Sequence, residues 1–233
     1  LACGIVLVAI GSTMSARVIA VVNQKGGAGK TTLSMLLAGA IAEKGAKVLV
    51  ADADPQNTAS HWAKVGEGFP AVVEDLSGEE GKLHKHLRKR LDDYDYIVID
   101  SPPAASAPVT LSALRLAHLA LVPVIPSPLD LWASLRIREA IHAAGEKNPV
   151  LQARIVVNQA QMNTILARDV LELLPEFGIP TLAAQLKQRT AYRQCAALGT
   201  TVAALGSRAA IASLEVEALR REVARILSRL GRS

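Results

Sequence analysis

The sequence predicts an α/β protein with a doubly wound, mostly parallel sheet and helices on both faces. Three observations support this class. Apolar runs typical of buried strands alternate along the chain with segments of helical periodicity. Hydrophobic residues make up 50% of the chain but aromatic residues only 3%, so Ala, Val, Leu and Ile must build most of the core. A length of 233 residues suits one such domain.

Strands and helices are predicted in alternation. The strand-like runs occupy residues 17–23, 47–52, 96–100, 119–125 and 154–158. Helices are predicted between and after them, over residues 29–44, 81–91, 106–116, 130–146 and 164–176. Right-handed crossovers between parallel strands place such helices on both sides of a sheet.

A last helix is predicted over residues 213–230. It has an apolar stripe at helical spacing, made of Leu219, Val223, Ile226, Leu227 and Leu230. Arginines lie between these positions. The pattern is typical of a helix packed on a domain surface. A helix lying on a membrane has a similar pattern, but the large aromatic anchors of such helices are missing here. We therefore favour packing and expect no stable membrane association.

The domain organisation is simple. No repeat, low-complexity run or long linker interrupts residues 14–233, which we interpret as one domain. Residues 1–13 are apolar but too short to span a bilayer, and we interpret them as an upstream extension with little part in function. A lipid-modified Cys3 is the weaker alternative, because it requires a signal segment before Leu1. With Cys195 as the only other cysteine, a reducing cytoplasm is expected.

The segment that carries the chemistry follows the first predicted strand and opens the first predicted helix. It reads Asn-Gln-Lys-Gly-Gly-Ala-Gly-Lys-Thr-Thr over residues 23–32. Small residues let backbone N–H groups turn toward a phosphate, and the helix N-terminus adds the positive end of its dipole. Lys30 can then reach the β and γ phosphates, and the Thr31 hydroxyl can ligate Mg²⁺.

The loop departs from the ordinary phosphate-loop pattern in two ways. Gln24 stands where that pattern has glycine, and Lys25 heads the loop. Residues 25–32 resemble the deviant Walker A motif of the ParA/MinD ATPases. The resemblance implies ATP and Mg²⁺ as cofactors and a dimer in which Lys25 crosses to the partner's phosphates. The residues it assigns to ATP binding are Lys25, Gly26, Gly27, Ala28, Gly29, Lys30, Thr31 and Thr32.

Two predicted strands end in aspartate. Residues 51–56 resemble the family's first switch, which implies that Asp54 lies near Mg²⁺ and the attacking water. Asp52 is equally compatible with a structural role at the strand end. Residues 94–103 resemble a Walker B strand and second switch, which implies that Asp100 holds the metal through water. The predicted metal site is therefore Thr31, Asp54 and Asp100, and the predicted catalytic residues are Lys25, Lys30 and Asp54.

Weaker similarities extend the resemblance to residues 17–230. Residues 122–130 and 187–192 resemble segments of the small ParF-like partition ATPases. Asn158 falls where the family's asparagine reads the adenine edge, and an amide offers the donor and acceptor that a purine requires. A turn-forming residue at the end of a strand is the alternative for Asn158.

Positive charge is unevenly distributed. The chain has a net charge of +5, and residues 82–90 form its densest basic run. That run is more typical of a solvated helix face. Residues 187–233 hold nine Lys and Arg against three Glu, an excess that favours non-specific binding to phosphate backbones. The candidate DNA-binding residues are Arg189, Arg193, Arg220, Arg221, Arg225 and Arg229.

The predicted function is that of a partition ATPase. We expect an ATP-bound homodimer that binds DNA non-specifically on the nucleoid, in the cytoplasm. A centromere-binding or cargo adaptor protein would stimulate hydrolysis. The nearest alternative is positioning of another cargo, such as carboxysomes or chemoreceptor clusters, and a MinD-like membrane ATPase is less favoured. Metal-cluster carriers on this fold need paired cysteines, which are absent. No feature indicates the small-molecule pocket of a ligase.

Overall fold

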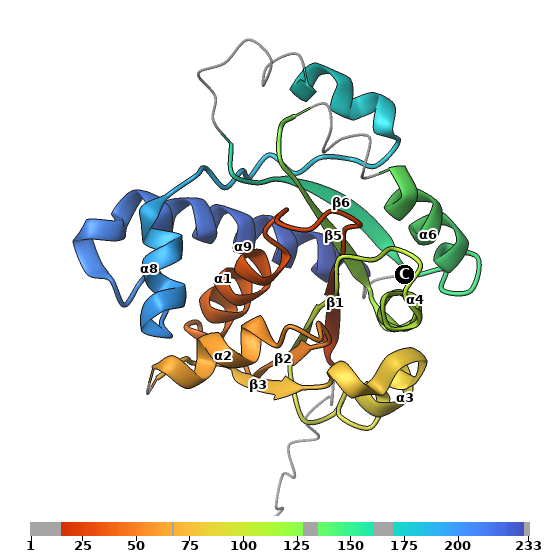
Figure 1. The fold of residues 1–233 in the computed structure, drawn as a ribbon, viewed down its shortest axis with the longest axis horizontal. Helices are drawn as coiled ribbons and strands as arrows, with labels where there is room; N and C mark the ends of the chain where they lie inside the picture. The colour runs from red at the N-terminus through yellow and green to blue at the C-terminus, as the bar shows by residue number, and fades with distance from the viewer. Residues whose placement is uncertain (1–14, 67, 128–134, 161–169, 231–233) are drawn as a thin grey trace, which may run out of the picture.

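A computed structural model describes residues 15–66, 68–127, 135–160 and 170–230 (Figure 1). It contains a six-stranded sheet in the order β3-β2-β4-β1-β5-β6, with every pair parallel. The fold class predicted from the sequence is therefore confirmed. The strands are β1 (Arg17–Val21), β2 (Val48–Asp52), β3 (Val72–Asp75), β4 (Tyr96–Asp100), β5 (Leu119–Val124) and β6 (Gln152–Val157).

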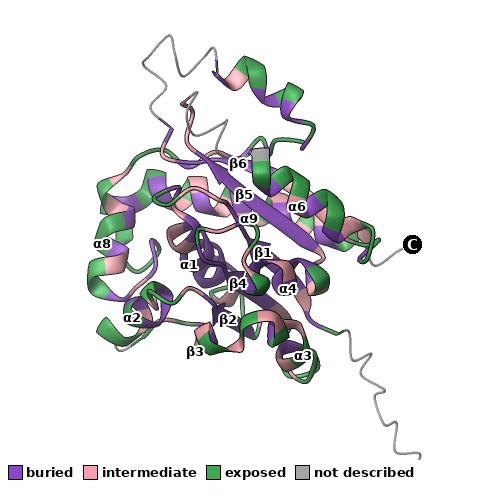
Figure 2. Cartoon of the chain, turned by 45° about the vertical axis from the view of Figure 1, so that its right-hand side comes forward, coloured by how far each residue is buried: buried purple, intermediate pink, exposed green. Residues whose placement is uncertain are grey.

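Helices cover both faces of the sheet and form two apolar clusters with it. One face is covered by α3 (Leu83–Arg88), α4 (Pro108–Leu116) and α6 (Leu135–Gly145). The other is covered by α1 (Lys30–Ala42), α2 (Thr58–Val65), α8 (Thr190–Leu198) and α9 (Ala210–Leu230). Figure 2 shows the buried sheet between these partly exposed helices. The central strands are mainly apolar because both of their faces are covered.

The register brings the candidate site together at one edge of the sheet. Val21 pairs with Asp100 across β1 and β4, and Asp52 pairs with Asp100 across β2 and β4. The carboxyl ends of three neighbouring strands therefore meet at one edge. Ligands of doubly wound sheets bind at this edge, near the point where the strand order reverses.

Several elements differ from the sequence prediction. β3, α2 and α8 are absent from the prediction. β3 is a partly exposed strand and has no long apolar run to indicate it. The helix expected at 81–91 starts at Leu83 after a 3-10 helix (Ser77–Lys82), and the last helix begins at Ala210. The end of the expected 164–176 helix includes another 3-10 helix, Leu174–Phe177. The extension at 1–13, residues 128–134 and residues 161–169 lie outside the described residues.

The apolar stripe of α9 packs against the domain. Val216, Leu219, Val223 and Leu227 are buried in the cluster that includes α1, and Ile226 and Leu230 pack partly against it. Packing, the favoured interpretation of this stripe, is therefore what the structure shows. Within the described ranges, no helix is long and apolar enough to cross a membrane.

Candidate functional site

The phosphate loop connects β1 to α1 and depends on glycine at two points. Gly27 and Gly29 have φ angles of 77° and 86°, which other residues rarely adopt. A Cβ on Gly29 would also lie 2.3 Å from Nδ2 of Asn158. Gly29 is thus required both for its backbone conformation and for the close approach of the residues after β6.

Lys30 is buried at the start of α1, and its amino group turns back over the loop. Its Nζ donates a hydrogen bond to the Lys25 carbonyl, at 3.2 Å. Burial lowers the pKa of Lys30, and the nearby carboxylates of Asp100 and Asp54 oppose this shift only in part. A phosphate in the loop would supply the missing counter-charge.

Asp100 lies fully buried at the end of β4. Its Oδ1 accepts a hydrogen bond from the Ser34 hydroxyl at 3.1 Å, and the nearby Thr31 hydroxyl favours the charged form of this carboxylate. Oδ2 has no hydrogen-bond partner among the described residues. Burial, with a smaller contribution from Asp52, raises the pKa of Asp100 to about 7.

This arrangement fits a magnesium site. Mg²⁺ takes oxygen ligands and keeps several waters, and it is usually bound through one or two carboxylates and the phosphates of the substrate. A buried carboxylate with one unsatisfied oxygen beside a threonine hydroxyl supplies that chemistry. Thr31 and Asp100 are the residues that would hold the ion, and the part of Asp54 in the metal site stays a prediction.

The two aspartates after β2 differ in their surroundings. Asp52 is buried, and its carboxylate accepts the Ser60 N–H at 2.8 Å and the Asp54 N–H at 3.4 Å. These bonds fix the start of α2, so Asp52 has a structural role. Asp54 lies half-buried in the following turn, where it accepts the Gln56 N–H at 3.0 Å. Only Asp54 therefore retains access to a ligand in the loop.

Gln24 has a structural role that the sequence did not reveal. Its Oε1 accepts the backbone N–H of Ala105 at 2.7 Å, which joins the phosphate loop to the segment after β4. Asn23 similarly donates to the carbonyl of Pro123 at 2.7 Å, near the end of β5. These bonds span 81 and 100 residues, so local sequence gave no signal for them.

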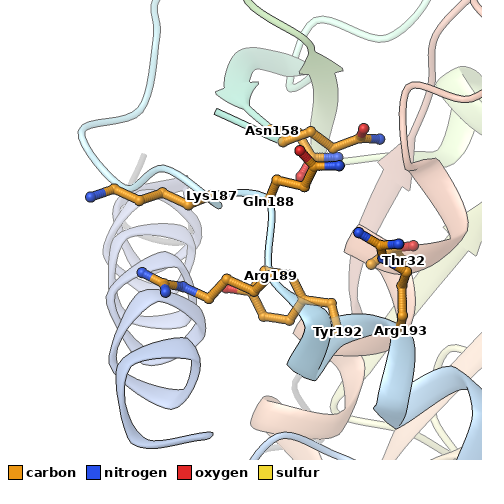
Figure 3. A pocket seen from close by; sticks show the side chains of 8 residues that line it. Thr32, Asn158, Lys187, Gln188, Arg189, Tyr192 and Arg193 are labelled. Atoms are coloured by element: carbon orange, nitrogen blue, oxygen red, sulfur yellow. The ribbon is translucent and has the colours of Figure 1, made fainter. Parts of the chain in front are cut away.

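A cavity of about 260 Å³ opens beside the start of α1 (Figure 3). Thr32 of α1 and Asn158 after β6 both line it. The side chains of Lys187, Gln188, Arg189, Tyr192 and Arg193 line it together with Gln159. Its position next to the phosphate loop suits a nucleoside, and adenine recognition by Asn158 stays a prediction.

Glu215 of α9 organises the segment that lines this cavity. It accepts hydrogen bonds from the Lys187 N–H at 3.2 Å, Arg189 Nε at 2.9 Å and the Tyr192 hydroxyl at 2.7 Å. Figure 3 shows Arg189 directed toward α9. These bonds hold the pKa of Glu215 below its ordinary value despite burial, and Arg189 already has an acidic partner.

The other candidate DNA-binding arginines divide into two groups. Arg220 and Arg221 both pair with Glu217, each at 2.7 Å, although Arg221 is otherwise well exposed. Arg193, Arg225 and Arg229 are exposed. Among the described residues, these three are the candidates without an ion pair, and binding of DNA by any of them stays a prediction.

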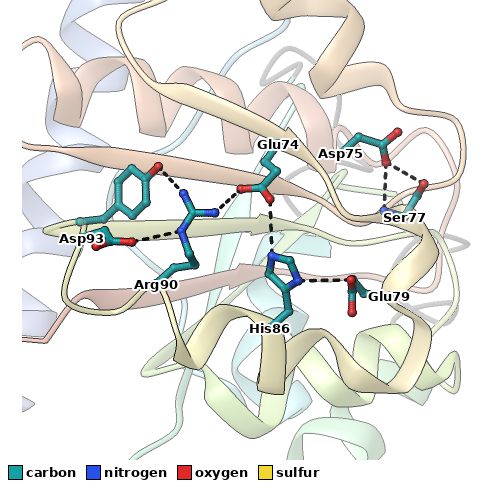
Figure 4. Close-up of polar contacts among 8 residues, drawn as sticks. Glu74, Asp75, Ser77, Glu79, His86, Arg90 and Asp93 are labelled. Atoms are coloured by element: carbon teal, nitrogen blue, oxygen red, sulfur yellow. Dashed lines mark hydrogen bonds and ion pairs between the residues drawn. The ribbon is translucent and has the colours of Figure 1, made fainter.

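The basic run at 82–90 is partly neutralised (Figure 4). His86 lies between Glu74 and Glu79, at 3.4 and 3.2 Å, and Arg90 pairs with Glu74 at 2.8 Å. Arg90 also contacts Asp93 at 3.2 Å. These contacts tie α3 and the turn after it to the edge strand β3, which agrees with a helix face as the main role of the run.

Comparison with known proteins identifies related chains. The family described as the CobQ/CobB/MinD/ParA nucleotide binding domain matches residues 19–202. The maintenance of carboxysome distribution protein A of Halothiobacillus neapolitanus is 34% identical over 206 residues, which cover 88% of this chain and 95% of that protein. The chromosome-partitioning ATPase Soj of Thermus thermophilus is 30% identical over 223 residues, covering 80% and 87%.

Solved structures have the same fold. Apo McdA from Cyanothece has a TM-score of 0.72 at 19% identity, over 88% of this chain and 99% of that one. Cobyrinic acid a,c-diamide synthase from Mycobacterium smegmatis, solved with ADP and magnesium, has a TM-score of 0.64 at 27% identity, over 78% and 92%. Since the family match spans well over half of its length, this chain belongs to the CobQ/CobB/MinD/ParA nucleotide-binding family, as an ATPase that uses ATP and Mg²⁺.

Proposed function

We propose that this chain is a ParA-type positioning ATPase that dimerises around ATP, binds DNA non-specifically and distributes a large cargo. The observation that carries the proposal is the position of Lys25, the lysine at the head of the phosphate loop. Lys30 is buried within its own loop, whereas Lys25 is only half-buried at its head. A lysine placed in this way is suited to neutralise the phosphates of a second subunit.

Hydrolysis in such a site depends on positioning and charge neutralisation, without a covalent intermediate. Lys30 would neutralise charge on the phosphates, and Asp54 would orient the attacking water. Mg²⁺, held by Thr31 and Asp100, would supply further charge neutralisation on the β and γ phosphates. An adaptor protein on the cargo would complete the site and trigger turnover on the nucleoid.

For the cargo, we propose a carboxysome or a similar protein assembly. The support is the Halothiobacillus relative, which matches over 95% of its length at 34% identity and is named for carboxysome distribution. Segregation of DNA is the second candidate, favoured by the match to Soj at 30% identity and to a ParA protein at 30%. The two candidates share the ATP-dependent dimer and differ in the adaptor.

Dimerisation is tested with Lys25→Ala and a slowly hydrolysed ATP analogue. We expect the variant to bind the analogue but to remain monomeric in light scattering, whereas the wild type dimerises. Lys147→Ala, at an exposed site after α6, is the matched control and should dimerise normally. A normal dimer from Lys25→Ala would show that this lysine does not act across an interface.

The cargo is tested by deleting the gene in its source cells while labelled carboxysomes and a labelled chromosomal locus are imaged. Clustered carboxysomes with normal chromosome inheritance would support the first candidate. Chromosome or plasmid loss with normal carboxysome spacing would support the second. In vitro, DNA together with the adaptor should stimulate hydrolysis, and no stimulation by either would count against both.

A further inference from the structure

Two successive amides just after β6 hold two successive carbonyls of the phosphate loop. Nδ2 of Asn158 donates to the carbonyl of Ala28 at 2.8 Å. Nε2 of Gln159 donates to the carbonyl of Gly27 at 3.0 Å. β6 is distant from the loop in sequence, so the fold alone creates this double contact.

The backbone around the contact is built to allow it. Asn158 is 3% exposed, and its own N–H is fixed by the carbonyl of Val124 at 2.9 Å. Gln159 has a φ of 52°, in the left-handed region that residues other than glycine, asparagine and aspartate seldom adopt. Gly29 permits the approach, since any Cβ there would collide with the Asn158 amide.

The contact has a consequence for the N–H groups of the loop. In a trans peptide, the C=O of one residue and the N–H of the next point in opposite directions. With the carbonyls of Gly27 and Ala28 turned toward the end of β6, the N–H groups of Ala28 and Gly29 must point away from it. In the part of the chain that the structure describes, neither N–H donates a hydrogen bond. Both are therefore available to an anion.

We infer that Asn158 and Gln159 are positioning residues for phosphate binding, which pre-orient the N–H groups of the loop by holding its carbonyls from behind. Pre-oriented donors bind an anion without the cost of ordering the loop first. This role would add to the adenine recognition predicted for Asn158, and it gives Gln159 a function in nucleotide binding. It rests on the loop binding phosphate, which Lys30→Ala tests separately.

The inference predicts a loss of affinity that depends on the phosphate chain and not on the base. We would measure Kd for ATP, ADP, AMP and GTP by displacement of a fluorescent ADP analogue. Gln159→Ala should raise the Kd for ATP and for ADP by about threefold to tenfold, as expected for the loss of one hydrogen bond. The affinity for AMP should fall less than that for ATP, and the ratio of the ATP and GTP affinities should not change.

A second variant separates positioning from folding. Gln159→Gly removes the amide but suits the left-handed backbone, so the nucleotide-free protein should unfold at the wild-type temperature or higher. Its affinity for ATP should nevertheless fall as in Gln159→Ala. Gln194→Ala, at an exposed site on α8, is the matched amide control and should bind ATP like the wild type.

Two results would overturn the inference. One is wild-type affinity for ATP in both Gln159 variants while Lys30→Ala loses binding, because the loop would then bind phosphate without the amide. The other is an equal loss for AMP and ATP with a changed ATP to GTP ratio, which would place Gln159 at the base. Failure of Lys30→Ala to lose ATP would instead remove the phosphate-loop assignment itself.

Discussion

The phosphate loop and helix α9 both bring basic and acidic side chains together, but only Glu215 and Glu217 of α9 are satisfied by arginines of the chain itself. Around the loop, burial lowers the pKa of Lys30 and raises that of Asp100, and one oxygen of Asp100 has no partner among the described residues. On α9, Glu217 binds Arg220 and Arg221, and the pKa of Glu217 falls to about 2. The first region is incomplete without a ligand, whereas the glutamates Glu215 and Glu217 of the second already have arginine partners.

The difference shows why net charge is a poor guide to a binding surface. Residues 187–233 have a clear excess of Lys and Arg, yet three of the six candidate arginines contact glutamates of α9. Exposed ion pairs add little stability, but they do reduce the positive charge offered to a polyanion. Buried charged groups without a full set of partners, such as Lys30 and Asp100 at the loop, are the stronger indicator of a ligand.

Removal of the loop's buried cation should have the largest effect. In Lys30→Ala, the phosphates lose their central cation, and we expect ATP binding to weaken by about 100-fold or more, with hydrolysis lost. Isothermal titration calorimetry with ATP and Mg²⁺ measures this directly. Wild-type turnover in the variant would show that the loop does not need Lys30 to bind phosphate, and the contrast between the loop and α9 would then fail.

Asp54 is predicted to act on hydrolysis and not on binding. Asp54→Ala should bind ATP and dimerise but hydrolyse it at least about tenfold more slowly, because the attacking water loses its orienting carboxylate. A phosphate-release assay with DNA present measures turnover. Unchanged turnover would make Asp54 a structural residue like Asp52, which holds the start of α2.

A substitution of Glu215 tests the network of hydrogen bonds between α9 and residues 187–192. Glu215→Ala leaves Arg189 and the Tyr192 hydroxyl without their acceptor, and we expect the free energy of unfolding to fall by about 2 kcal/mol. Urea denaturation of the nucleotide-free protein measures the loss. Glu146→Ala, at an exposed site just after α6, is the matched glutamate control and should change stability little. Equal stability of both variants would show that this network contributes little.

Asp100 makes a prediction about pH. Because its pKa is raised to about 7 in the folded state from an ordinary 3.8, the native state retains this proton more strongly than the unfolded state. This group therefore favours folding most at low pH, and its contribution declines as pH rises from about 4 to 7. Asp100→Asn should remove that part of the decline in nucleotide-free protein, measured by urea denaturation at several pH values. If the free energy of unfolding changed with pH in the same way in the wild type and in Asp100→Asn, Asp100 would not be the group whose pKa is raised.

The smallest effect is expected from single arginines of α9. Arg225→Ala should reduce the slope of log K against log salt by about one for each DNA phosphate that the arginine neutralises, equally on two unrelated duplexes. Arg220→Ala should change the slope less, because Glu217 already neutralises that arginine. The experiment compares ATP with ADP at several salt concentrations. Equal slopes for both variants would contradict the division of the arginines by their partners.

Local sequence determined the sheet's central strands and the residues of the phosphate loop. Strands β1 and β4 are mainly apolar because both faces are covered, and the loop motif consists of adjacent residues whose chemistry does not depend on distant contacts. Asp100 was predicted for the same reason, at the end of such a run. The edge strand β3 was missed because its half-exposed side chains need no apolar pattern.

Tertiary structure alone decided which partners these residues have. The hydrogen bonds between Asn158 and Ala28, between Gln24 and Ala105, and between Glu215 and Arg189 join positions 130, 81 and 26 residues apart. Composition counts charges and amides, but the chain's path through the fold sets which donor faces which acceptor. For that reason the sequence identified the phosphate loop, while the fold revealed the amides that hold it and the glutamates that occupy the arginines.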